Sequence, residues 1–175
     1  MNGQRIFITG FMGSGKTTVA RELARRLNCG WVDLDDLITK QERRTPGEII
    51  DQDGEEKFRE TETQMLRQVL GTRSEQVIAA GGGAWTIADN RKLLAQHGAI
   101  TIWLDAPFKL CWNRIEASGQ ERPLAPSYEA ARRRYQERLD TYALSDFRLV
   151  VTENETPEEI GLRIAGLISR DGTNN

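Results

Sequence analysis

The chain has 175 residues, of which 24 are Lys or Arg and 26 are Asp or Glu, so its formal net charge is −2. This length, with 38% hydrophobic and 29% charged residues, predicts one globular domain over residues 1–175 and excludes disordered, collagen-like and coiled-coil chains. The charge does not favour a nucleic-acid partner, and no apolar run approaches the ~20 residues of a membrane span.

Hydrophobic periodicity divides the chain into short apolar strands and amphipathic helices. The first half is predicted to contain strands at 5–9 and 31–33 and helices at 16–27, 35–40, from 45–47 onward, and 54–70. The second half is predicted to contain strands at 77–80, 99–104 and 149–152, helices at 88–96, 107–117, 127–142 and 157–169, and a polar loop at 118–128. This alternation predicts an α/β fold with a parallel sheet covered on both faces.

The two cysteines, Cys29 and Cys111, have neither CxxC spacing nor the pattern of a disulfide framework. Such cysteines are typical of a reducing compartment. The N-terminus passes directly into a strand pattern instead of a signal peptide. Both observations predict a cytoplasmic protein.

Residues 10–17, with the sequence GFMGSGKT, match the phosphate-binding pattern G-x-x-x-x-G-K-[ST]. The motif lies between the first predicted strand and the first predicted helix, where backbone N–H groups and the helix N-terminus attract phosphate. Lys16 would reach the β- and γ-phosphates, and Thr17 could ligate Mg²⁺. The predicted nucleotide-binding residues of the loop are Gly13, Ser14, Gly15, Lys16, Thr17 and Thr18.

Two carboxylates lie at the end of the second predicted strand, where Asp33 is its last residue and Asp35 comes two residues later. Ligands of such sheets bind beyond the carboxyl ends of the strands, so one carboxylate could hold Mg²⁺ while the other meets an acceptor hydroxyl. The alternative is that Asp35 caps the following helix. The third strand ends in three glycines at 81–83, which predicts close approach of the backbone to another group.

Further motifs follow in a fixed order: DLD at 33–35, FRETE at 58–62, GGG at 81–83, RPL at 122–124 and RLDTY at 138–142. Together with the phosphate loop, their order and spacing resemble the shikimate kinase family over nearly the whole chain. The resemblance implies a three-layer α/β/α P-loop kinase fold, with five parallel strands in the order 2-3-1-4-5. It also implies a lid at about 118–128 and substrate-binding helices at about 35–71.

The implied reaction is ATP-dependent phosphorylation of the 3-hydroxyl of shikimate, a step of chorismate and aromatic amino-acid biosynthesis. The implied partners are ATP and shikimate, with Mg²⁺ as cofactor, no nucleic acid and no membrane, and the protein would be a monomer. By resemblance, Asp35 contacts the ring hydroxyls, Arg59 and Arg138 hold the substrate carboxylate, and Glu62 orients Arg59. The backbone of Gly81, Gly82 and Gly83 would touch the ring.

The resemblance also assigns residues to the nucleotide. Asp33 and Thr17 would organise Mg²⁺, and Arg122 would descend from the lid onto the phosphates. Arg114 and the turn at Pro157 would pack the adenine. The implied catalytic residues are Lys16, Asp35 and Arg122.

Three positions differ from the family's motifs. Asp140 stands where the family has proline, and it would either compete for Arg138 or face water. Ala125 replaces a leucine that often follows RPL, which could loosen the lid. Trp85, just after the glycine run, would either reshape the pocket or pack beneath it.

Three other functions remain open from the sequence. The first is a kinase of the same fold for another small hydroxy acid or sugar acid, such as gluconate. The second is an ATP-binding protein without catalysis. The third is a nucleic-acid module that uses the arginines at 132–134, although these could also form a helix face near anionic substrates.

Overall fold

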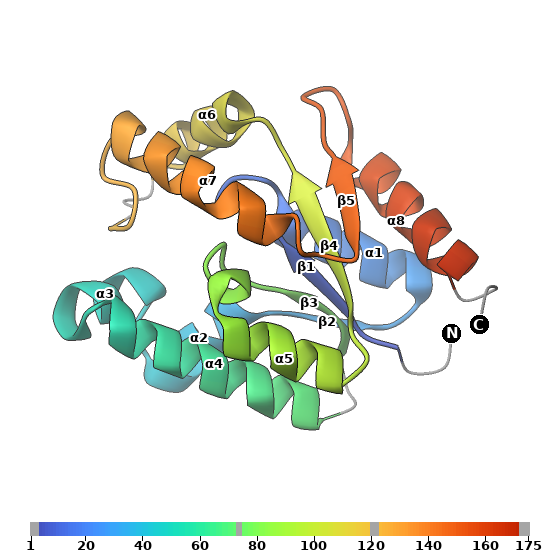
Figure 1. Ribbon diagram of the computed structural model, residues 1–175, viewed down its shortest axis with the longest axis horizontal. Coiled ribbons are helices and arrows are strands. Elements are labelled where there is room, and N and C mark those ends of the chain that lie inside the picture. The colour runs from blue at the N-terminus through green and yellow to red at the C-terminus, as the bar shows by residue number, and fades with distance from the viewer. Residues whose placement is uncertain (1–3, 73–74, 120–122, 172–175) are drawn as a thin grey trace.

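The computed structural model describes residues 4–72, 75–119 and 123–171. Its strands form one parallel sheet in the order β2-β3-β1-β4-β5 (Figure 1). The strands are β1 (Ile6–Thr9), β2 (Gly30–Asp33), β3 (Glu75–Ala79), β4 (Ile100–Asp105) and β5 (Phe147–Val150). The structure thus confirms the predicted fold class and strand order.

The central strands are buried on both faces, which explains their almost continuous apolar sequences. Phe7 and Ile8 of β1, Ile78 of β3 and Ile102 of β4 are fully inaccessible to solvent. Register brings Ile8 beside Ile102 on one side, and Ile6 beside Val77 on the other. This core fixes the carboxyl ends of β1, β3 and β4 relative to one another.

Helices cover both faces of the sheet, as Figure 1 shows. They are α1 (Lys16–Leu27), α2 (Leu34–Glu42), α3 (Pro46–Asp53), α4 (Glu55–Gly71), α5 (Ala88–Gln96), α6 (Phe108–Ser118), α7 (Tyr128–Tyr142) and α8 (Pro157–Asp171). Right-handed crossover connections put α1 on one face of the sheet and α4, α5 and α7 on the other. The last helix, α8, packs against α1. None of the helices in the described residues is long and apolar enough to span a membrane.

Most element boundaries agree with the sequence predictions to within about two residues, and α1 and α5 have the predicted bounds. The last strand differs, because β5 spans Phe147–Val150 instead of 149–152. Asp146 accepts hydrogen bonds from the backbone N–H and the hydroxyl of Thr101. This contact brings the chain against β4 just before Phe147, so β5 begins two residues earlier than predicted. A short 3₁₀ turn, η1 (Ala84–Thr86), was not predicted and follows the glycine run.

Candidate active site

A cavity of about 780 Å³ lies at the carboxyl ends of the strands, between the phosphate loop and helices α2, α3, α4 and α7. It brings together most of the predicted site residues. They are Gly13, Gly15, Lys16, Thr17, Thr18, Asp33, Asp35, Arg59, Gly81, Gly82, Gly83, Arg114 and Arg138. Ser14 and Pro157 do not line this cavity: Ser14 is a buried residue of the loop, and Pro157 begins α8. Arg122 lies outside the described residues.

The conformation of the phosphate loop requires its glycines. Gly13 and Gly15 have φ values of +77° and +96°, which L side chains rarely adopt. A Cβ on Gly13 would also lie 2.5 Å from the carbonyl oxygen of Cys111. Arg114 of α6 donates from Nη1 to the carbonyl oxygen of Gly13 at 3.2 Å, so it lies against the phosphate loop.

Asp33 and Thr17 form an oxygen-rich pair next to the loop. Thr17 Oγ1 donates to Asp33 Oδ2 at 2.5 Å, and Asp33 Oδ1 accepts from the backbone N–H of Asp35 at 2.9 Å. Asp33 is therefore the N-cap of α2. The alternative interpretation of the sequence, in which Asp35 caps this helix, is wrong. Asp35 lies inside the first turn, half-buried, and lines the cavity.

These groups suit Mg²⁺, which prefers hard oxygen ligands and uses one or two protein groups together with substrate phosphates. Thr17 and Asp33 offer a hydroxyl and a carboxylate within hydrogen-bond distance of each other. Among the described residues there is no group of three or more His, Cys, Asp or Glu side chains that could enclose a metal by itself. The neighbouring hydroxyl and carboxylate of Thr17 and Asp33 fit Mg²⁺ as two of its oxygen ligands.

The glycine run is surrounded by the side chains of the cavity. A Cβ on Gly81 would lie 2.9 Å from Glu62 Oε1, and one on Gly82 would lie 3.3 Å from Arg138 Nη1. A Cβ on Gly83 would overlap the guanidinium group of Arg59. A Cβ on Gly82 would also lie 3.0 Å from the carbonyl oxygen of Gly10, so the three glycines leave room for backbone as well as for charged side chains.

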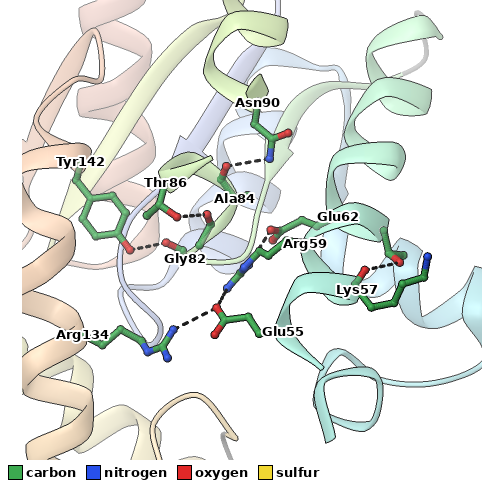
Figure 2. A network of polar contacts seen from close by, with 12 residues as sticks. Glu55, Lys57, Arg59, Glu62, Gly82, Ala84, Thr86, Asn90, Arg134 and Tyr142 are labelled. Atoms are coloured by element: carbon green, nitrogen blue, oxygen red, sulfur yellow. Dashed lines mark hydrogen bonds and ion pairs between the residues drawn. The ribbon is translucent and has the colours of Figure 1, made fainter. Parts of the chain in front are cut away.

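Arg59 is held by two carboxylates of its own helix, α4, as Figure 2 shows. Its Nη1 donates to Glu62 Oε2 at 2.7 Å, and its Nη2 donates to Glu55 Oε1 at 3.0 Å. These partners lie three and four residues from Arg59, the spacing at which helical side chains meet. Glu62 is 0% exposed, so it anchors the guanidinium from the protein interior.

Burial raises the pKa of Glu62 to about 7; the nearby charge of Arg59 opposes this rise, and that of Asp35 adds to it. Between the ordinary value of 4.5 and about 7, the folded protein retains a proton that the unfolded chain has lost. The contribution of Glu62 to stability therefore falls as the pH rises through this window, by about 3 kcal/mol in total.

We expect the free energy of unfolding of Glu62→Gln to be close to that of wild type near pH 5. Near pH 8 it should exceed the wild-type value by about 2–3 kcal/mol, because the glutamine stays neutral where Glu62 ionises. Urea unfolding of both proteins at the two pH values measures this difference. A stability difference that does not change with pH would contradict a raised pKa. At pH 8, where Glu62 of the wild type is mostly ionised, the same variant should also bind a substrate carboxylate less tightly, because Arg59 would lose its charged anchor.

Two hydrogen bonds join the end of α7 to the glycine run and to the 3₁₀ turn η1 that follows it. Tyr142 donates its hydroxyl to the carbonyl oxygen of Gly82 at 2.6 Å. Trp85 donates from Nε1 to the carbonyl oxygen of Thr141 at 2.8 Å and packs against Phe7 with a ring separation of 6.0 Å. At 4% exposure, Trp85 packs beneath the cavity and is not among the residues that line it, which decides between the two alternatives for this residue.

We expect Trp85→Phe to reduce the free energy of unfolding by about 0.5–1.5 kcal/mol more than the smaller ring alone would, because the carbonyl oxygen of Thr141 loses its indole donor and keeps the backbone N–H of Leu144. Denaturant unfolding measures the loss. Trp112→Phe, in the half-buried aromatic cluster of α6, is the matched control for reduced ring size. If both variants lose the same stability, the hydrogen bond of Trp85 contributes nothing specific.

The other two unusual positions are also placed by the structure. Asp140 is exposed and lies beside a second, shallow pocket under β4 and β5, so it faces water and not the cavity that Arg138 lines. Ala125 is 5% exposed and belongs to the hydrophobic core. Its neighbours Pro123 and Leu124 line the cavity.

Glu55 and Arg134 were not assigned a role from the sequence. Glu55 precedes Arg59 by one helical turn, and this spacing was the signal available for it. Arg134 belongs to the basic run at 132–134, but only the tertiary structure separates it from its neighbours. Arg132 and Arg133 are exposed, whereas Arg134 donates from Nη1 to Glu55 Oε1 at 3.3 Å.

Comparison with known proteins finds matches over most of the chain. The family model described as shikimate kinase matches residues 12–168. A shikimate kinase from Synechococcus elongatus is 38% identical over 171 residues, which cover 96% of this chain and 88% of that protein. The structure of a shikimate kinase from Acinetobacter baumannii in complex with shikimate superposes with a TM-score of 0.88 at 31% identity, covering 96% of this chain and 94% of that one.

A gluconokinase from Sinorhizobium meliloti represents the alternative class of acceptor. It superposes with a TM-score of 0.60 at 16% identity, covering 98% of this chain and 95% of that one. A similarity at this level of identity shows a shared fold and carries no statement about the acceptor.

Proposed function

This chain belongs to the shikimate kinase family, and from that premise we propose that it transfers the γ-phosphoryl group of ATP to the 3-hydroxyl of shikimate. One observation carries the proposal beyond family membership. A single cavity is lined by the phosphate loop, by the carboxylate of Asp35, and by the guanidinium groups of Arg59 and Arg138. These are the groups needed for a nucleotide and for an acceptor that has both a hydroxyl and a carboxylate.

For the nucleotide, the loop amides and Lys16 would bind the phosphates, and Arg114 would lie near the base. Thr17 and Asp33 would hold Mg²⁺, which neutralises charge on the phosphates when bound. Lys16 lies at the first position of α1, where the positive end of the helix adds to its charge. Catalysis by these residues consists of positioning and charge stabilisation, because phosphoryl transfer needs little covalent assistance.

For the acceptor, Arg59 and Arg138 would form charge-assisted hydrogen bonds with the carboxylate of shikimate. The ring would then lie along the backbone of Gly81, Gly82 and Gly83. Asp35 would accept a hydrogen bond from the reacting hydroxyl and orient it toward the γ-phosphate. Because Glu62 holds Arg59 from a buried position, the guanidinium would stay anchored at Nη1 while the carboxylate binds.

We also propose that residues 118–128 act as a lid within this single domain. Pro123 and Leu124 line the cavity, and a Cβ on Gly47 would lie 3.6 Å from Pro123 Cγ. The described end of this segment therefore meets the start of α3 across the cavity. Arg122, one residue before Pro123, would reach the phosphates when the lid closes and water is excluded.

The test is ADP formation from ATP and Mg²⁺ with shikimate, with gluconate, and with no acceptor. We expect shikimate to give a rate far above the other two reactions. Higher turnover with gluconate would assign the protein to the alternative class of acceptor. Nucleotide binding without turnover on either acid would indicate an ATP-binding protein without this activity.

A further inference from the structure

One carboxylate at the edge of the cavity is shared by arginines of two different helices. Glu55, in the first turn of α4, accepts on Oε1 from Arg59 Nη2 at 3.0 Å and from Arg134 Nη1 at 3.3 Å. Figure 2 shows Arg134 extending from α7 toward Glu55 on the side opposite Arg59. The shared oxygen therefore joins α4, which carries Arg59, to α7, which carries Arg138.

The guanidinium of Arg59 is occupied on both terminal nitrogens. Nη1 is bonded to Glu62 and Nη2 to Glu55, and the backbone of Gly83 lies against the group. These two bonds use two of the five N–H donors of the guanidinium, so a further carboxylate can still bind, but the negative charges of Glu62 and Glu55 oppose it. Glu62 is 0% exposed and Glu55 is 40% exposed, so Glu55 is the partner that can leave at the lower desolvation cost.

Arg134 offers Glu55 a second ion pair. Its side chain is 28% exposed, and it lies one helical turn before Arg138, so both arginines project from the same face of α7. When Arg59 turns to another anion, Glu55 can remain bonded to Arg134. If Arg134 were neutral, Glu55 would rely on Arg59 for its ion pair and would compete more strongly for it.

We propose that Arg134 is a positioning residue for the substrate carboxylate. Its ion pair with Glu55 remains when Arg59 breaks its own bond to Glu55 and binds the carboxylate of the acceptor. The inference rests on the proposed function and adds to it a specific role for a residue that acts through another side chain. Two consequences distinguish it from a structural role. Arg134 governs acceptor affinity and not the chemical step, and its effect depends on the negative charge of Glu55.

The experiment compares Arg134→Gln, Glu55→Gln and the double variant in the ADP assay and in direct shikimate binding. Arg134→Gln should raise the KM for shikimate about two- to fivefold, the range for a partly exposed ion pair, with kcat and the KM for ATP unchanged. The double variant should return the KM for shikimate to the wild-type value or below, because a neutral amide in place of the Glu55 carboxylate no longer competes as an anion. Arg133→Gln, which removes the same charge from an exposed position of α7, should have no effect.

Each other outcome overturns the proposal. An unchanged KM for shikimate in Arg134→Gln would show that the shared ion pair does not affect the acceptor. A raised KM that the double variant does not restore would mean that Arg134 acts without Glu55, for example by touching the substrate. An equal effect of Arg133→Gln would indicate general attraction of an anion. Failure of the proposed function itself would be recognised in the wild-type protein, which would then show no ADP formation dependent on shikimate.

Discussion

Lys16→Ala should reduce kcat by at least about 100-fold while the protein remains folded, since removal of one preorganised cation from a transition state costs about 3–4 kcal/mol. The ammonium group of Lys16 donates to the carbonyl oxygen of Phe11 at 2.9 Å, so it is held above the loop at the entrance to α1. Charge develops between the β- and γ-phosphates during transfer, where this group would lie. Initial rates at saturating ATP and shikimate measure the loss.

Lys109→Ala is the matched control, because Lys109 lies on α6 and does not line the cavity. It should leave kcat and thermal unfolding unchanged. Thermal unfolding of Lys16→Ala should also stay near the wild-type temperature, because one loop hydrogen bond contributes only about 0.5–1.5 kcal/mol. Turnover at the wild-type rate in Lys16→Ala would be incompatible with the assigned role of the phosphate loop.

Replacement of either arginine of the clamp should weaken the acceptor specifically. We expect Arg59→Ala or Arg138→Ala to raise the KM for shikimate about tenfold or more, because a hydrogen bond to a charged group contributes about 1.5–3 kcal/mol. The KM for ATP should change little, since neither side chain belongs to the phosphate loop. Because Arg138 is 7% exposed, unfolding must be measured beside the kinetics to separate a loss of binding from a loss of stability.

Asp140→Asn is the control for this pair. Asp140 is exposed and faces away from the cavity, so its replacement should leave the KM for shikimate unchanged. Asp140→Pro is a poorer control, because this residue lies within α7, where proline removes a backbone donor. If both arginine variants phosphorylated shikimate as well as wild type, the carboxylate clamp would be wrong and neutral alcohols would become the acceptors to test.

Features that depend on short stretches of chain could be predicted closely from the sequence. The first helix has the predicted bounds Lys16–Leu27, because its apolar spacing and the glycines before it are local signals. A helix was predicted to open at 45–47, and α3 does begin there, with Thr45 and Glu48 forming a capping box. The order of the strands came from the family resemblance, since periodicity says which segments are strands but not which of them pair.

Features that depend on the approach of distant segments could not be read from the sequence. The third strand's glycines predicted a close approach, but only the fold shows that Glu62, Arg138 and Arg59 each occupy the space beside one of them. In the same way, no local pattern distinguishes Arg134 from Arg133.

The sequence by itself determined the class of fold, the nucleotide loop and the family, because these are written in motifs and periodicities that span a few residues. The tertiary structure alone decided which charges from different helices and strands meet. It placed Asp140 toward water, buried Trp85 beneath the cavity, and brought Glu55 of α4 to Arg134 of α7, some 79 positions apart in the chain. The reason is physical: an ion pair depends on distance and burial, and both are set by the packing of the whole core rather than by neighbours in sequence.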